Sequence, residues 1–148
     1  MYNVLDVARY VLAYCNEQGY IMSNLKLQKV LYFIQAEFLI SWGTSCFKEK
    51  IEAWAFGPVV PEVYHEYKIF GSSNIIGNFL ESGRPISRPD RELINGMVDA
   101  CDRYSASELV TLTHNQDPWR NAYQKYYNNV ISIDSIEEYF RKQIWQKL

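Results

Sequence analysis

The segment from Asn24 to Trp42 constrains the fold more than any other part of the sequence. Its apolar residues cover a wide surface rather than one narrow stripe: Leu27, Val30, Leu31, Phe33, Ile34, Ala36, Phe38, Leu39 and Ile40. A helix that is apolar on several sides needs neighbours on several sides. We therefore predict a central helix over about 24–42, which begins behind Ser23-Asn24 and ends at Gly43.

Four polar residues interrupt the apolar surface of this predicted helix. Lys26 and Lys29 fall on its first two turns, and Gln28 and Gln35 lie seven residues apart on one face. Polar groups on a central helix need hydrogen-bond partners or water. We interpret them as a solvated helix start, with a binding role as the alternative.

The other periodic segments predict helices that surround the central one. They cover 4–18, 61–71, 88–104, 105–113, a segment that begins at Asp117 and carries Tyr126 on one face, and a terminal segment from Ser135. Asn3 is suited to cap the first helix and Gly19 to end it. Ser105–Glu108 and Ser135–Glu138 both have the sequence of a capping box.

Extended structure is predicted only in short pieces. Residues 50–56 alternate loosely between polar and apolar and indicate a strand, and Ile75–Ile76 is the expected partner. The expected fold is mainly α: a single compact domain over 1–148, with six or seven helices and at most a short two-stranded β-hairpin.

The composition is ordinary for a globular domain, except for its aromatic rings. The 148 residues are 48% hydrophobic and 22% charged, as expected for one core. Twelve Tyr, seven Phe and four Trp make 16% of the chain aromatic, and so small a core cannot bury them all. Exposed rings favour recognition of another protein; a Tyr-rich core with hydroxyls at its rim is an equal alternative.

The net charge, the cysteines and the hydropathy limit which partners and which cellular compartment we expect. The net charge of -2 gives no overall field to gather nucleic acid or an anionic membrane. Cys15, Cys46 and Cys101 form no C-x-x-C pair, and their odd number disfavours a disulfide framework. Because neither a secretory signal nor an apolar window of membrane-spanning length is visible, we expect a cytosolic protein without a membrane partner.

The sequence predicts no metal site and no cofactor. The two histidines, His65 and His114, lack the spacing of a zinc site such as H-E-x-x-H. The glycines are too dispersed for a phosphate-binding turn.

The most enzyme-like cluster is Thr113–Trp119. His114 beside Asp117 resembles a general base with its orienting carboxylate, which is the basis for a small hydrolase or transferase as an alternative function. We favour a structural role, in which His114 bonds a nearby backbone group or carboxylate and fixes the turn before Asp117.

A second unusual stretch is 53–61, AWAFGPVVP. Gly57 allows backbone conformations that other residues avoid, while Pro58 and Pro61 stiffen the chain around it. Such a segment suits a rigid docking loop or a pocket wall. It is also consistent with a plain strand-to-helix corner that has Trp54 in the core.

Three blocks together resemble the Panacea domain family, which includes SocA-like antitoxins and phage-associated GepA proteins. They are NLKLQKVLYFIQAEFL (24–39), EAWAFGPVVPEVYHEYKIFG (52–71) and SELVTLTHNQDPWRNAY (107–123). The resemblance implies a mainly helical antitoxin that neutralises a cognate toxin by direct protein contact. In SocA-like members it implies an adaptor that delivers the toxin to a ClpXP-type protease.

From these motif positions and their chemistry we expect a partner-binding surface and no catalytic residues. Its expected members are Trp54, Phe56, Gly57, Pro58, Tyr64, His114 and Trp119. Besides the His-dependent enzyme, a prophage-encoded regulator that binds nucleic acid remains an alternative; it requires a basic face.

Overall fold

The computed structural model describes residues 1–79 and 85–147, and it is mainly helical, as predicted. Its elements are α1 (Val4–Gln18), α2 (Asn24–Trp42), β1 (Ile51–Trp54), β2 (Gly57–Val59), α3 (Pro61–Tyr67), a 3-10 turn η1 (Lys68–Phe70), α4 (Arg88–Asp102), α5 (Ala106–His114), α6 (Asp117–Ala122), β3 (Val130–Ile131) and α7 (Ile133–Lys147). Within the described residues, no helix has a stretch long and apolar enough to cross a bilayer.

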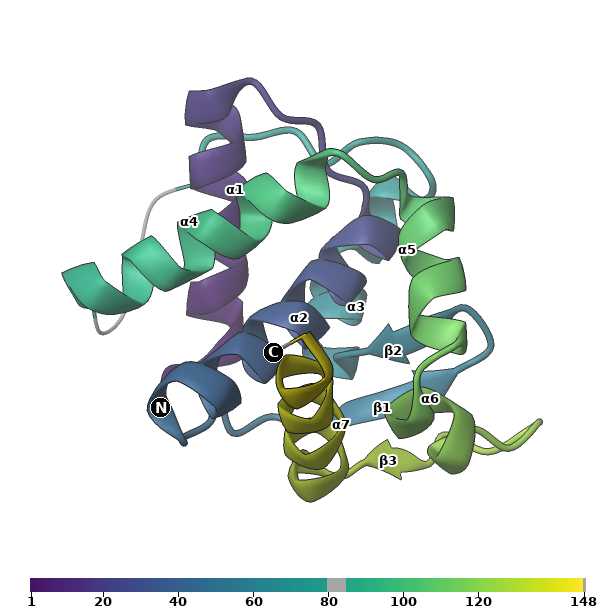
Figure 1. Cartoon of the computed structure of the whole chain (residues 1–148). Coiled ribbons are helices and arrows are strands. Elements are labelled where there is room, and N and C mark those ends of the chain that lie inside the picture. The colour runs from purple at the N-terminus through teal and green to yellow at the C-terminus, as the bar shows by residue number, and fades with distance from the viewer. Residues whose placement is uncertain (80–84, 148) are drawn as a thin grey trace.

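The prediction of a central helix is confirmed. Helix α2 runs through the middle of the molecule (Figure 1) and packs against α3, α4, α5, α7 and β2. The Ser23 hydroxyl caps it by accepting from the backbone N–H of Lys26 at 3.2 Å, and Gly43 ends it in the left-handed conformation. Its apolar residues form the centre of one continuous core.

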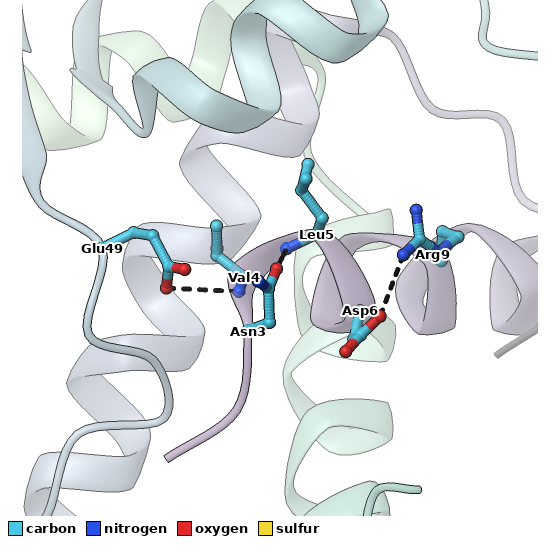
Figure 2. Close-up of polar contacts among 6 residues, drawn as sticks. All are labelled: Asn3, Val4, Leu5, Asp6, Arg9 and Glu49. Carbon is cyan, nitrogen blue, oxygen red and sulfur yellow. Dashed lines mark hydrogen bonds and ion pairs between the residues drawn. The ribbon is translucent and has the colours of Figure 1, made fainter. Parts of the chain in front are cut away.

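Helix α1 begins as the sequence predicts and is tied to the segment before β1. Figure 2 shows Asn3 Oδ1 accepting from the Leu5 N–H at 2.8 Å and Glu49 Oε1 accepting from the Val4 N–H at 3.2 Å. The Glu49 carboxylate thus satisfies an otherwise unpaired donor at the positive end of the helix. Asp6 and Arg9 form an ion pair of 2.9 Å one turn further on.

The sheet differs from the prediction. It has three strands in the order β2-β1-β3, and Trp54 of β1 pairs with Gly57 of β2 across a two-residue turn. The expected pairing of 50–56 with Ile75–Ile76 is wrong, because the chain reverses at once after Trp54 and β2 takes that edge. Ile75 instead donates its N–H to the carbonyl of Met22 at 2.8 Å.

Two further expectations fail at helix ends. The Ser135–Glu138 capping box does not form, since α7 begins earlier and the Ser132 hydroxyl accepts from the Ser135 N–H at 3.1 Å. Strand β3 keeps the chain extended up to that point, so the first available serine becomes the cap. Tyr126 is not part of α6, which ends at Ala122. By contrast, the capping box of Ser105 and Glu108 forms as predicted.

Candidate functional site

The polar residues of α2 lie inside the protein, so the predicted solvated helix start is wrong. Lys26, Gln28, Lys29 and Gln35 are all buried, as is Asn24. Four of these side chains bond backbone groups that approach α2: Asn24 and Gln28 bond α3 and the residue before it, Lys29 bonds the hairpin, and Gln35 bonds the connection after α2.

Gln28 links α2 to the start of α3. Its Oε1 accepts from the Val60 N–H at 2.9 Å, and its Nε2 donates to Asn24 Oδ1 at 2.9 Å. Asn24 in turn donates to the carbonyl of Tyr64 at 3.1 Å. This chain of hydrogen bonds fixes where α3 leaves the sheet, and with it the position of Tyr64.

Lys29 supports the β1–β2 hairpin from the side of α2. Its Nζ donates to the carbonyl of Pro58 at 3.0 Å, so it occupies the position that a neighbouring strand would take on this sheet edge. A Cβ on Gly57 would lie 2.5 Å from Lys29 Cε and 2.9 Å from Thr113 Oγ1. With a φ of 104°, Gly57 is therefore required both by its conformation and by the closeness of Lys29. Burial lowers the pKa of the Lys29 amine to about 7.

Two rings support the same hairpin from the other side. Trp119 Nε1 donates to the carbonyl of Trp54 at 2.8 Å, and His114 Nε2 lies 2.9 Å from the carbonyl of Ala55. His114 stacks on Trp119 with ring centroids 4.0 Å apart, and Trp119 stacks on Tyr123 at 4.6 Å. The hairpin turn is thus held between α2 on one side and α5 and α6 on the other.

His114 has a structural partner rather than a catalytic one. A carbonyl oxygen only accepts hydrogen bonds, so Nε2 carries the proton and donates to Ala55. The partner lies 59 residues away in sequence, not in the adjacent turn as expected. Asp117, the proposed orienting carboxylate, pairs with Arg120 at 2.8 Å. Across the described ranges, His, Cys, Asp and Glu form no group of three or more that could hold a metal ion.

Phe56 protrudes from the hairpin turn between two hollows. Its side chain is 68% exposed. The first hollow, of about 310 Å³, is lined by Leu25, Gln28, Trp54, Phe56, Val59, Tyr64, Gly71 and Ser72. The second, also about 310 Å³, is lined by Trp54, Ala55, Phe56, Tyr123, Tyr126, Tyr127 and Asn128. We call the rings of Trp54, Phe56, Tyr64, Tyr123, Tyr126 and Tyr127 the hairpin-tip surface.

The family model described as antitoxin SocA-like, Panacea domain, matches residues 27–120, which is more than half of the chain. The chain belongs to this antitoxin family. The matched span runs from the first turn of α2 into α6, so it contains the hairpin and both of its supports.

A curated relative of the chain is itself named as an antitoxin. Antitoxin SocA of Caulobacter vibrioides (strain NA1000 / CB15N) is 34% identical over 109 residues, which cover 66% of this chain. The matched part is 58% of the relative's own length, so this chain corresponds to less than two thirds of that protein. No solved structure matches the chain.

The structure brings the seven residues expected at the partner surface into one region of the Panacea domain. Trp54, Tyr64, His114 and Trp119 are half-buried, and Phe56 is exposed. Gly57 and Pro58 are buried, so they hold the hairpin from within and offer no side chain to solvent.

Sequence reasoning missed the tyrosines that follow the Panacea match. Tyr126 is 90% exposed and has a φ of 71°, the only positive φ outside glycine in the described residues. Such a conformation costs a tyrosine about 1–3 kcal/mol, and Tyr126 lines the second hollow. The run Tyr123–Tyr127, polar apart from its rings, was the available signal.

Proposed function

We propose that this chain neutralises a cognate protein toxin by binding it directly through the hairpin-tip surface. Membership of an antitoxin family supports a toxin as the partner. The observation that carries the choice of surface is Phe56, a large exposed ring between two hollows on a hairpin that is fixed from both sides.

The physical basis is pre-organisation. Binding energy is reduced by whatever has to be ordered on association, and a loop that is already rigid loses little. Here the carbonyls of Trp54, Ala55 and Pro58 each accept a hydrogen bond from Trp119, His114 and Lys29 respectively. The hairpin backbone that carries Trp54 and Phe56 therefore meets a partner in a fixed conformation, and aromatic anchors with adjacent hollows are typical of the residues that dominate binding energy.

Neutralisation by occlusion and delivery of the bound toxin to a ClpXP-type protease both begin with this binding step. We propose this binding step alone; it takes place in the cytosol and needs no catalysis by the antitoxin.

The test is co-expression of the products of the genes on either side with this chain. We expect one of them to inhibit growth when expressed alone, to be tolerated with the wild-type chain, and to co-purify with it. Phe56→Ala should weaken the measured affinity about thirtyfold or more, because a central aromatic anchor contributes about 2 kcal/mol.

Trp42→Ala is the matched control. Trp42 is half exposed at the far end of α2 from the hairpin, so its loss should leave affinity unchanged. Equal effects of the two substitutions would place the toxin elsewhere on the protein. Toxin levels that fall on co-expression in a protease-competent host, but not in a ClpXP-deficient one, would identify the delivery route.

A further inference from the structure

Among the residues that the structure describes, Lys29 is the most deeply buried basic side chain. Its side chain is 0% exposed, and its amine donates to one carbonyl, that of Pro58. The methylene next to the amine lies 2.5 Å from the position that a Cβ on residue 57 would take. The amine is therefore enclosed between α2 and the hairpin.

The groups beside this amine are uncharged, and His114, the titratable side chain that α5 directs at the hairpin, bonds the carbonyl of Ala55 instead. From the hairpin comes the Pro58 carbonyl, and from α5 the Thr113 hydroxyl lies beside the same Gly57 gap while donating to the carbonyls of Leu109 and Val110. Burial is the cause of the lowered pKa, and no carboxylate in the described part of the chain contributes to it. The other buried lysine of α2, Lys26, acts electrostatically on Cys15, Cys101 and Glu108 and not on Lys29.

We propose that the Lys29 amine is a proton-controlled support of the hairpin: when it takes up a proton from solvent, lifting of β1–β2 from α2 becomes more favourable and the hairpin-tip surface loosens. An ammonium group has three donors, and in this site one carbonyl receives one of them. Solvation of the charge requires one wall of the site to move. Helix α2 is packed by α3, α4, α5 and α7, whereas β2, the strand that rests on Lys29, is a three-residue edge strand, so the hairpin yields at β2.

The direction of the pH dependence follows from the two pKa values. In the closed form the amine has a pKa of about 7, and in an open, hydrated form it returns to its ordinary 10.5. Between these values the open form holds more protons, so opening becomes more favourable as pH falls and levels off below pH 7. From pH 8.5 to pH 7 the opening equilibrium should rise about fifteenfold.

The consequence for toxin binding rests on the proposed function; the opening itself does not. Trp119 provides a local probe, because its indole N–H bonds the carbonyl of Trp54 and loses that partner when the hairpin lifts. We would measure hydrogen exchange of this indole proton by NMR between pH 6 and 8.5, expressed as a protection factor. Burial raises the pKa of the Cys15 and Cys101 thiols to about 11, so their ionisation makes opening more favourable as pH rises. That opposite trend lies above the pH range of this measurement.

In the wild type we expect protection of the Trp119 indole to fall about fifteenfold from pH 8.5 to pH 7. Lys29→Met, which keeps the length of the side chain without the amine, should remove this dependence. Lys48→Met, the same change at an exposed lysine, should retain it. Protection that is independent of pH in the wild type, or a pH dependence that persists in Lys29→Met, overturns the proposal.

Direct titration of the Lys29 side-chain nitrogen by NMR needs no variant and covers the case in which Lys29→Met fails to fold. A midpoint near pH 7 supports the inference, and a midpoint near 10 overturns it. Toxin affinity measured over the same range separates the two proposals. If the wild type binds no neighbouring gene product, the proposed function is wrong and the inference about Lys29 is unaffected. If the toxin binds but hairpin opening is independent of pH, the inference about Lys29 is wrong and the proposed function is unaffected.

Discussion

At the scale of single residues, Gly57 matters through the atom that it lacks. Its φ of 104° is one that side-chain-bearing residues avoid, and the space beside it is already filled by the Lys29 side chain and the Thr113 hydroxyl. Conformation and packing therefore select the same residue, and a change at this position acts on the hairpin as a whole.

Gly57→Ala should destabilise the protein by about 2 kcal/mol or more, since it adds a clash to the backbone strain. Gly43→Ala is the matched control: φ is 73° there, but nothing lies within 4 Å of the added methyl group, so the cost should stay near 1 kcal/mol. Urea unfolding of the two variants measures the difference. Equal losses would show that conformation alone selects glycine at position 57.

At the scale of elements, α2 combines two roles that a sequence pattern normally separates. Its apolar residues form the centre of the core, while its buried amides substitute for backbone partners of segments too short to pair fully. Gln35 illustrates this, because its Oε1 accepts from the Cys46 N–H at 2.7 Å and its Nε2 donates to the carbonyl of Phe47 at 2.9 Å. Gln35 thus holds the connection between α2 and β1 from the side of α2, while Tyr2 and Val4 bond it from the start of the chain.

Gln35→Leu should therefore cost about 3 kcal/mol or more, although leucine suits a helix core, because it leaves buried backbone groups unpaired. Gln18→Leu, the same change at an exposed position of α1, should alter stability by less than about 0.5 kcal/mol. The free energies of unfolding of both variants test this. A mild effect at position 35 would mean that water replaces the amide.

At the scale of the whole molecule, the core extends beyond the family match. Helix α7 lies after residue 120, yet Ile136 is fully buried and Phe140 makes edge contacts with Tyr32 and Phe33 of α2 at centroid distances of 5.9 Å and 6.2 Å. The Panacea core of this chain is completed by a helix that the family model does not cover.

Ile136→Ala should lower the free energy of unfolding by about 2–5 kcal/mol, the range for a truncated core isoleucine. Ile133→Ala, one turn earlier on the same helix and 37% exposed, should cost clearly less. Thermal and urea unfolding measure both. Similar small losses at the two positions would show that α7 is an appendage rather than part of the core.

The sequence by itself determined the features that depend on neighbours along the chain. The bounds of α1 and α2, their caps at Asn3 and Ser23, and the capping box of α5 follow from local hydrogen bonds and from a period of 3.6 residues. Motif blocks were enough to predict the Panacea family, which the comparisons confirm.

Only the tertiary structure decided what depends on distant partners. Lys29 and Gln28 look like a solvated helix start until the hairpin, some thirty residues on, covers them. Gly57–Val59 rather than Ile75–Ile76 pairs with β1 because the chain reverses directly after Trp54. The Trp119–Trp54 contact joins residues 65 positions apart. Burial and long-range hydrogen bonds are properties of the packed chain, so periodicity alone could not assign them.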